Sequence, residues 1–374
     1  MRGHAGVLWF SNETPDRFGQ GGQRRQYFQI AALVADGHPV HVLSWTGPQD
    51  DSSIRRLCPV TRIDRFARNP VRRAAAVIGA LLLAAARPWD CVVIAHAESW
   101  PFGRLLGRCA RRPVLVDLHN VNSHWLSTAG DSVGASAARR TERSILRGAD
   151  AVTVCADRER GFLEQSGDAS RVIVLPHGVA PDEWTTPPVR PTATIKMFGN
   201  WGWPPNQAGL EWFLSVVWPL VRAEAPEAIV EVAGTVPPGL CWPEGSRAMG
   251  RVPRLDEFCS DAAAIAVPVK AGVGAPLKFA EALASGIPVV ATSEAAHGSA
   301  SFGATVTDEP GEWVRALVNC LNHDPELRAQ ALRARSQVLT KCSWAEASRP
   351  LRDWVAACAG PAGRAVVRHD DPVA

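Results

Sequence analysis

The chain has 374 residues, which predicts two domains at roughly 100 to 200 residues per domain. Apolar residues at 46% and charged residues at 21%, with 31 Gly and 29 Pro, exclude collagen-like, fibrous and fully disordered chains. A net charge of +3 is too small for a protein that holds nucleic acid by charge, although a local basic pocket for an anionic small molecule is compatible with it. The nine cysteines form no C-x-x-C pair, which indicates a reducing cytoplasm and no structural zinc.

Short β-branched or apolar runs alternate with helical patterns along the chain, as in βαβ units with parallel sheets. In the first half we expect strands at 6–10, 39–44, 91–95, 113–117, 151–155 and 172–175, with helices at 23–36, 100–110, 137–147 and 157–165. In the second half we expect strands at 194–198, 228–233, 264–267 and 288–292, with helices at 207–222, 277–285 and 310–321. The two halves therefore share one plan.

Residues 179–194 contain four prolines and four threonines and little apolar periodicity, which predicts a linker. We expect an N-terminal domain at 1–180, a C-terminal domain at 193–342, and a final part at 343–374 with a helix kinked at Pro350 and a loose tail. Two doubly wound domains would face each other across a cleft. Ligands of such sheets bind at the carboxyl ends of the strands, so functional residues should directly follow strands.

The longest apolar stretch, residues 74–86, has 13 residues, well short of the ~20 that cross a bilayer. The start of the chain lacks the features of a secretory signal, so we expect a cytoplasmic protein. Basic residues precede the stretch at Arg62, Arg65, Arg68, Arg72 and Arg73, as in segments that rest on an anionic membrane. We favour a buried helix with a solvated basic lead-in, and keep peripheral contact with the inner membrane face as the alternative.

A loop with Gly19, Gly21 and Gly22 follows the first expected strand and leads into a helix near residue 23. Such a loop lets backbone N–H groups and the positive helix end approach an anion or a sugar, and an ordinary turn is the alternative. Arg24 and Arg25 oppose the dipole of that helix, which indicates a role beyond local stability.

The sequence DLHN brings Asp117, His119 and Asn120 to the carboxyl end of the strand at 113–117. A histidine there can donate or accept a hydrogen bond near neutral pH. A functional histidine and a satisfied loop histidine both stay open as interpretations.

The most informative stretch, residues 266–293, reads as strand, glycine loop, helix and strand. Gly272 and Gly274 free the backbone to turn, and Lys278 and Glu281 lie three residues apart on one helix face. A cation at a helix N-terminus can neutralise a diphosphate, and a carboxylate one turn later can accept both hydroxyls of a ribose. The pattern predicts a nucleoside diphosphate site, with an exposed ion pair as the alternative.

Together these patterns resemble the retaining nucleotide-sugar glycosyltransferases of the GT-B fold, specifically glycosyltransferase family four. The resemblance covers roughly residues 5–345 and rests on six segments in the family's order: GGQRRQYFQIAALVADGHPVHVLS, DLHN, ERSILRGADAVTVCADRER, VIVLPHGV, FGNWGWPPNQAGLEWFLSVVWPLV and GAPLKFAEALASGIPVVATS. It implies an α/β architecture of two Rossmann-like domains, with the acceptor side in the first and the nucleotide-sugar donor in the second.

The resemblance also implies roles for particular residues. His119 lies beside the donor sugar and Lys278 faces the phosphates, and these two are the expected catalytic residues. Glu281 matches the glutamate that holds the ribose. The expected donor-binding set is Gly21, Gly22, Arg24, Asn200, Gly272, Gly274, Ala275, Leu277, Lys278 and Glu281.

The chain departs from the family's pattern at three places. The first glutamate of the family's pair is Val273, so backbone amides or other groups must meet the sugar hydroxyls. Pro276 stands where a basic residue is frequent, and residues 199–206 lack the usual Arg and Lys. Lys278, helped by Arg24, then carries the phosphate charge nearly alone.

The resemblance implies metal-independent, retaining transfer of a hexose-type sugar from a UDP- or GDP-linked donor to a glycan, a lipid-linked glycan or a small natural product, with no cofactor. No residue stands out as a covalent nucleophile, so we favour front-face attack in which the leaving phosphate takes the acceptor proton. The alternatives are a non-catalytic nucleotide-sugar-binding partner of another transferase and a sugar-nucleotide epimerase. Trp201 and Trp203 follow a strand of the second half and are candidates to stack on a sugar or an acceptor.

Overall fold

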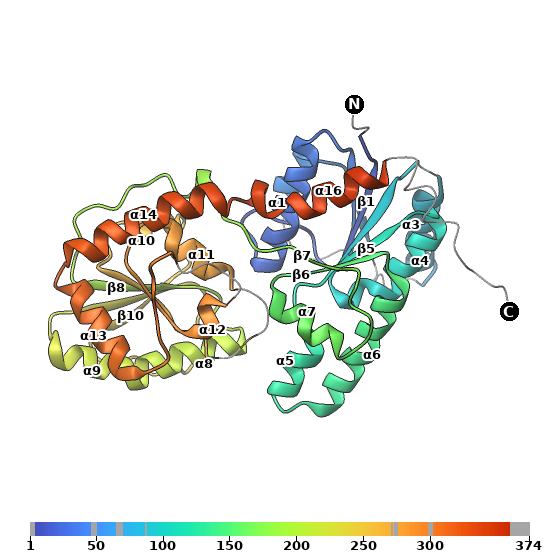
Figure 1. Cartoon of the computed structure of the whole chain (residues 1–374). Helices are drawn as coiled ribbons and strands as arrows, with labels where there is room; N and C mark the ends of the chain where they lie inside the picture. Colours follow the sequence, from blue (N-terminus) through green and yellow to red (C-terminus); the bar gives the residue numbers. More distant parts are fainter. Residues whose placement is uncertain are drawn as a thin grey trace. The chain divides into compact units, whose positions relative to one another are not determined.

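The computed structural model describes residues 4–45, 51–64, 70–86, 88–270, 272, 276–297 and 302–359. The chain divides into two units, one formed by Met1–Pro176 with Ala347–Ala374 and the other by His177–Glu346 (Figure 1). Each unit is built around one parallel sheet, as expected from the alternating strands and helices. The predicted class, two Rossmann-like α/β domains, is confirmed.

Unit 1 holds a seven-stranded sheet in the order β3-β2-β1-β4-β5-β6-β7. Its strands are β1 (Val7–Ser11), β2 (Val40–Trp45), β3 (Val60–Ile63), β4 (Cys91–Ala95), β5 (Val114–Asp117), β6 (Ala151–Val154) and β7 (Val172–Val174). Every residue of β1, β4, β5 and β6 is buried, because helices cover both faces of a parallel sheet. This explains the continuous apolar runs that marked these strands in the sequence.

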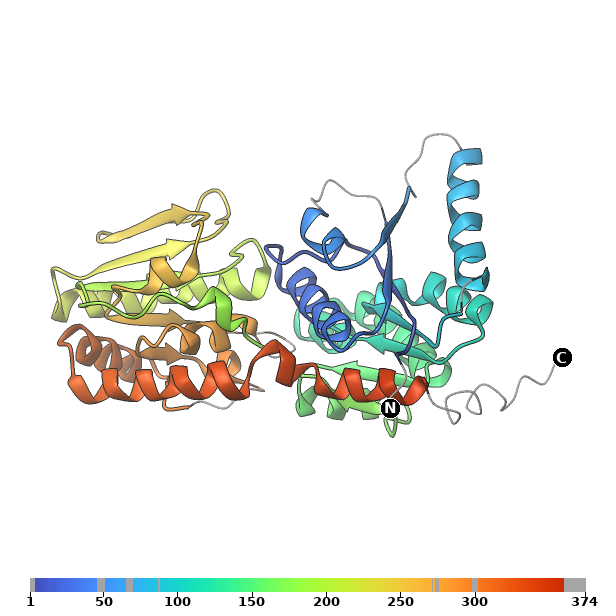
Figure 2. The same cartoon turned by 90° about the horizontal axis from the view of Figure 1, so that it is seen from above.

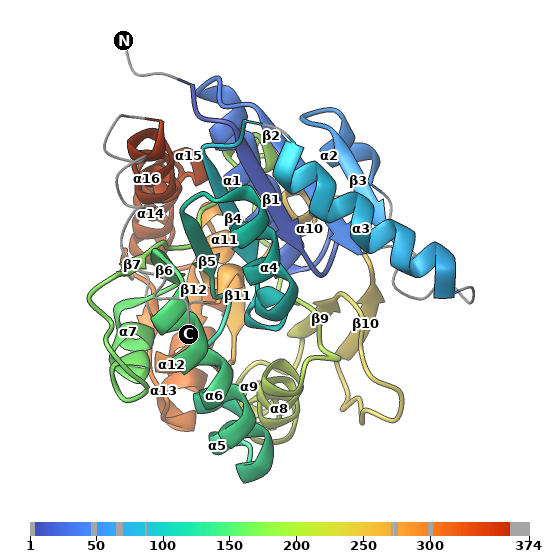
Figure 3. The same cartoon turned by 90° about the vertical axis from the view of Figure 1, so that its right-hand side faces the viewer.

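The helices of unit 1 are α1 (Gly21–Ala35), α2 (Ser52–Arg55), α3 (Pro70–Ala86), α4 (Trp100–Ala110), α5 (Asn122–Thr128), α6 (Ser132–Gly148), α7 (Asp157–Glu164) and α16 (Arg349–Cys358). Right-handed crossovers place α1 and α2 on one face of the sheet and α3, α4 and α6 on the other. Figure 3 shows the second group together on one face.

Unit 2 holds a six-stranded sheet in the order β10-β9-β8-β11-β12-β13. Its strands are β8 (Thr194–Phe198), β9 (Ile229–Ala233), β10 (Ser246–Gly250), β11 (Ala264–Val267), β12 (Val289–Ala291) and β13 (Thr305–Val306). Its helices are α8 (Pro204–Trp212), α9 (Trp218–Glu224), α10 (Leu255–Cys259), α11 (Leu277–Ala284), α12 (Ser293–Ala296), α13 (Pro310–Leu321), α14 (Pro325–Lys341) and α15 (Trp344–Ala347). Apolar clusters pack around this sheet, one with Trp218 and Trp313 and the other with Phe279 and Trp184.

The helix predicted over 207–222 is interrupted by a π-helical turn at Phe213–Val217. Pro219 lies in the first turn of α9, and a proline has no backbone N–H to continue the regular hydrogen-bond ladder. The wider turn just before it accommodates the proline without ending the helical rod.

The domain limits differ from the expected ones at both junctions. The segment 179–194, expected to be a linker, belongs to unit 2: Val179 and Trp184 lie in its core, and the Val179 N–H donates to the Cys342 carbonyl. The final helix α16 belongs to unit 1, where Arg352 forms an ion pair with Asp36, the C-cap residue of α1. Pro350 begins α16 and so does not kink a longer helix.

Helix α3 differs from the buried helix that the sequence favoured. Ala80 and Ala84 are buried against the unit, but Val71, Ile78 and Leu82 are 73%, 55% and 62% exposed. Figure 2 shows α3, in light blue, as a straight helix at the edge of unit 1. Among the described residues, no helix has both the length and the apolarity needed to cross a membrane.

Candidate functional site

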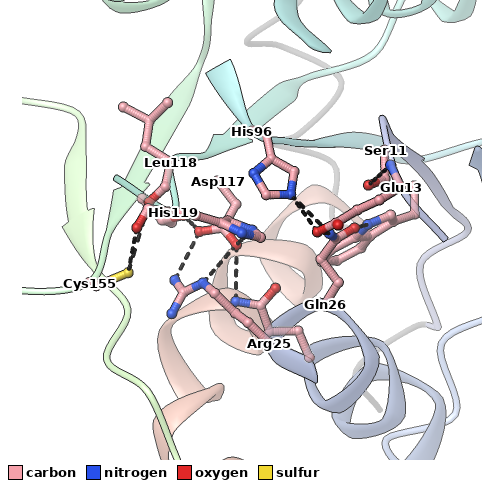
Figure 4. Close-up of polar contacts among 12 residues, drawn as sticks. Ser11, Glu13, Arg25, Gln26, His96, Asp117, Leu118, His119 and Cys155 are labelled. Atoms are coloured by element: carbon pink, nitrogen blue, oxygen red, sulfur yellow. Dashed lines mark hydrogen bonds and ion pairs between the residues drawn. The ribbon is translucent and has the colours of Figure 1, made fainter. Parts of the chain in front are cut away.

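The strand order of unit 1 reverses between β1 and β4, which leaves a crevice at the carboxyl ends of these two strands. Ser11 at the end of β1 pairs with Ala95 at the end of β4, and Ala95 pairs with Asp117 at the end of β5. The residues that follow these ends, Glu13, His96 and His119, therefore lie close together (Figure 4).

Asp117 is the centre of a buried polar network in this cluster. Arg25, fully buried on α1, donates from Nε and Nη2 to the two carboxylate oxygens over 3.0 and 2.9 Å. Gln29 and Thr153 donate to the same carboxylate over 3.1 and 2.5 Å. Burial alone would raise the pKa of Asp117, but the charge of Arg25 and a hydrogen bond from His119 hold that pKa well below its usual range. Asp117 is therefore a carboxylate at neutral pH.

His119 is held between this carboxylate and the start of α1. Its Nε2 lies 3.3 Å from Asp117 Oδ2, so Nε2 carries the proton and Nδ1 is left as an acceptor. Burial, with the neighbouring His96, lowers the pKa of His119 to about 4 against the opposing effect of Asp117. The imidazole is therefore neutral at pH 7.

Gly22 lies against the acceptor nitrogen of His119. A Cβ on residue 22 would lie 2.9 Å from His119 Nδ1 and 3.0 Å from Glu13 Oε1, so any larger residue would press on both groups. Gly21 and Gly22 are the first residues of α1 itself, whereas the sequence placed them in a loop before the helix. Arg24, half-buried, donates from Nη1 to the Arg17 carbonyl over 2.7 Å and stacks on Phe28.

Glu13 and His96 were not predicted from the sequence. His96 Nε2 lies 3.0 Å from Glu13 Oε1, and the Gln26 amide contacts both groups at 3.3 Å. His96 has a φ of +69°, a strained conformation for a residue with a side chain and one found mostly at functional sites. Both residues follow strands of the sheet, so the rule that singled out His119 would also have found them.

Glu13, His96 and His119 each offer one ligand atom within 4.8 Å of the others. Two imidazoles and a carboxylate form a donor set suited to zinc or another transition metal. No metal ligand was predicted from the sequence. The described part of the chain thus contains one group able to hold such an ion, formed by residues that also make the hydrogen bonds described above.

In unit 2 the strand order reverses between β8 and β11, and the expected donor-binding residues follow these strands. Lys278, in the first turn of α11, directs its ammonium over the ring of Trp201 at 4.7 Å. Its Nζ is buried and has no hydrogen-bond partner among the described residues. Burial lowers the pKa of Lys278 to about 7, against the opposing charge of Glu281, itself buried on the same helix.

The two tryptophans expected to stack on a sugar or an acceptor, Trp201 and Trp203, differ in their surroundings. Trp201 is 1% exposed, lies in the core, and donates its indole N–H to the Ala233 carbonyl, so its ring contacts Lys278 and is not available for the stacking role expected from the sequence. Trp203 is 42% exposed and stays a candidate. Asn200, also exposed, accepts a hydrogen bond from the Gly202 N–H.

The remaining expected donor residues lie near the start of α11. Leu277 is its first residue, and a Cβ on Gly272 would meet the Glu294 carboxylate at 3.7 Å. Gly274 and Ala275, together with Val273, lie outside the described residues. The structure therefore brings together Gly22 with His119 in unit 1, and Lys278 with Trp201 and Glu281 in unit 2.

Comparison with known proteins agrees with this architecture. Residues 20–178 match the family described as "Glycosyl transferase 4-like domain", and residues 192–323 match "Glycosyl transferases group 1". No curated protein sequence matches the chain.

Among solved structures, Anabaena HepE in complex with UDP and glucose is similar with a TM-score of 0.73 at 14% identity, over 94% of this chain and 99% of that one. Sucrose-phosphate synthase from Thermosynechococcus elongatus gives 0.70 at 16% identity, over 93% and 98%. WaaG, a glycosyltransferase involved in lipopolysaccharide biosynthesis, gives 0.65 at 15% identity, over 93% and 99%. These likenesses define the GT-B fold. With both family matches, they establish that the chain belongs to the GT-B glycosyltransferases of the family-four type.

We predict that Asp117→Asn destabilises unit 1 strongly, because it leaves the guanidinium of Arg25 buried without its counter-charge. Breaking a buried pair in this way costs about 3–5 kcal/mol of the free energy of unfolding. The second change Arg25→Met should recover part of this loss. Because the pKa of Asp117 is lowered on folding, its contribution should be complete above the ordinary carboxyl pKa and be lost as the pH falls through the lowered value.

Denaturant unfolding followed by circular dichroism measures these differences. Arg55→Met is the control, since Arg55 forms an exposed pair with Asp51 in the same unit and should cost about 1 kcal/mol or less. A loss for Asp117→Asn no larger than that of the control would contradict the prediction.

Proposed function

We propose that the chain transfers a hexose-type sugar from a UDP- or GDP-linked donor to an acceptor hydroxyl, with retention of configuration and without a metal or another cofactor. The observation that carries this proposal is the ammonium of Lys278 at the start of α11, which is buried and has no hydrogen-bond partner among the described residues. A cation kept out of water at a helix N-terminus suits a group that gains negative charge, as a departing diphosphate does. Family membership supports the transferase chemistry.

The donor nucleotide is assigned to unit 2. Lys278 faces the diphosphate, the backbone N–H groups of Gly272 and Leu277 donate to it, and Asn200 is a further candidate contact. Glu281, one turn further along α11, accepts the ribose hydroxyls. HepE has been crystallised with UDP and with UDP-glucose, which supports a uridine nucleotide as the first to test.

The transferred sugar is assigned to the cluster in unit 1. The Nδ1 of His119 accepts a hydrogen bond from a sugar hydroxyl, because Asp117 fixes the proton on Nε2. The backbone of Gly21 and Gly22 approaches the reacting centre, since neither residue carries a side chain there. Arg24 adds positive charge at the same end of α1.

A front-face mechanism fits the carboxylates of this cluster. Asp117 is buried and already accepts hydrogen bonds from Arg25, Gln29 and Thr153, so it is poorly placed to act as a covalent nucleophile. The leaving phosphate would then take the proton from the acceptor hydroxyl, with Lys278 stabilising its charge. The acceptor is a glycan, a lipid-linked glycan or a small natural product, and Trp203 offers an exposed indole for stacking on it.

We expect the purified chain to consume one member of a panel of UDP- and GDP-hexoses in the presence of a chelator and to form an α-linked product from an α-linked donor. Mass spectrometry identifies the donor and the acceptor, and NMR assigns the anomer. No turnover of any donor despite nucleotide binding would indicate a non-catalytic nucleotide-sugar-binding partner. Activity lost in chelator and restored by a divalent ion would contradict metal independence and point to the cluster of Glu13, His96 and His119.

Binding of the nucleoside diphosphate should depend on pH through Lys278. The free ammonium has a pKa near 7 and the bound phosphates should raise it, so affinity should be constant below pH 7 and fall by up to about tenfold per unit above it. Calorimetry at several pH values with Lys278→Met as the control removes the titration of the nucleotide itself. Equal pH dependence in both proteins would show that Lys278 does not contact the phosphates.

Glu281→Ala and His119→Ala should affect different properties of the protein, the first the affinity for the diphosphate and the second the rate of transfer. The ribose is present in the free diphosphate, so losing Glu281 should weaken diphosphate binding itself. The transferred sugar is absent from the diphosphate, so His119→Ala should keep its affinity while transfer falls by about a hundredfold, the size of a typical lost transition-state contact. Titration with the diphosphate beside initial rates gives the comparison. Equal losses of affinity would place His119 at the nucleotide and not at the sugar.

A further inference from the structure

A groove lined by arginines lies between α4 and α6 of unit 1, away from the residues assigned to transfer. Its volume is about 510 Å³, within the range of small-molecule sites, and it is lined by Arg104, Arg140, Arg143, Ser144, Arg147 and Gly148. Four of its six lining residues are cationic and none is acidic. We propose that this groove binds phosphate groups.

The sequence of α6 builds one wall of the groove. Arg140, Arg143 and Arg147 are spaced at i, i+3 and i+7, so their side chains emerge on one face of the helix. Like charges at such spacing destabilise a helix, so local stability does not account for them. Glu142 on the same helix does not offset the repulsion between these arginines, because its side chain is buried and accepts a hydrogen bond from the Ser123 N–H.

The contacts around the groove join its two helices and leave the charges of its arginines without a carboxylate partner among the described residues. Trp100 at the start of α4 donates its indole N–H to Ser144 Oγ over 3.0 Å, which joins the two helices. The Arg104 guanidinium lies over the Trp100 ring, and Arg143 Nε donates to the Ser166 carbonyl. In the part of the chain that the structure describes, none of the four arginines forms an ion pair.

Arginine suits phosphate in particular, because its planar guanidinium can donate two parallel hydrogen bonds to two phosphate oxygens. Several arginines around one open groove can therefore hold a phosphate group that remains partly in water. The phosphate could belong to a lipid head group or to a soluble compound, since both present the same oxygens.

Helix α3 favours the lipid head group. It packs beside α4 on the same face of the sheet as the groove and exposes Val71, Ile78 and Leu82 along its outer side (Figure 3). Apolar side chains on the same face of the unit as a basic groove match the interface of an anionic bilayer, where acyl chains lie just below the phosphates. Vesicles are therefore the first probe.

The test compares the full-length wild-type protein with Arg140→Gln/Arg147→Gln, since both side chains are exposed and neither forms an ion pair with another described residue. The control is Arg55→Gln/Arg56→Gln, which removes the same charge from the opposite face of the sheet. Sedimentation with phosphatidylglycerol vesicles, with phosphatidylcholine as the neutral reference, forms one arm. Calorimetric titration with tripolyphosphate forms the other, and thermal melts check that all proteins are folded.

We expect the wild type and the control to bind phosphatidylglycerol vesicles and the groove variant to bind at least about tenfold more weakly, given the usual contribution of each basic residue at a membrane. The same loss confined to tripolyphosphate would support the groove with a soluble ligand as its occupant. Equal binding by the groove variant and the control in both arms, or no binding by the wild type, would overturn the proposal. Neither arm measures sugar transfer, so the outcome does not depend on the proposed reaction.

Discussion

The buried ion pair between Arg25 and Asp117 determines the geometry of the cluster in unit 1. Both side chains are shielded from water, so the pair is stable only because the two oxygens of Asp117 receive donors from α1, from β6 and from His119. This requirement fixes α1 against the ends of the central strands. It also fixes the first turn of α1, because Arg25 lies only three residues after Gly22, and so it sets how closely the backbone can approach His119.

The same topological feature produces both groups of candidate functional residues. In each sheet the strand order reverses once, between β1 and β4 in unit 1 and between β8 and β11 in unit 2. At such a point the helices that follow the two strands run in opposite directions, so the carboxyl ends of these strands are left open. Polar residues that would be costly elsewhere in a parallel sheet, such as His96 and Lys278, can be held there.

This regularity is why much of the fold and part of the site follow from the sequence. Buried parallel strands are mostly apolar, so β4, β8 and β11 were predicted with the limits that the structure shows. β3, β10 and β13 were not predicted. Thr61 and Arg62 interrupt the apolar pattern of Val60–Ile63, the exposed edge strand Ser246–Gly250 has no apolar run, and Thr305–Val306 is too short to show one. His119 and Gly22 were found from their place after strands. Arg25 was noted only for its position against the helix dipole, because its local sequence does not indicate that its partner is Asp117, 92 residues away. The docking of α16 on unit 1 is a similar long-range contact, invisible in a helix pattern that fits either unit.

Desolvation has different consequences for the two residues that we assign to catalysis. His119 has a fixed partner in Asp117, which orients the ring without making it charged, so the imidazole offers one defined acceptor over the whole range near neutral pH. Among the described residues, the ammonium of Lys278 faces the ring of an indole, and a carboxylate on the same helix raises its pKa only in part. Its charge is therefore the one that a phosphate ligand can change most. A diphosphate beside it would both draw a proton onto the lysine and be held by the charge that results, so the binding of the donor would itself complete the electrostatic environment that its departure requires.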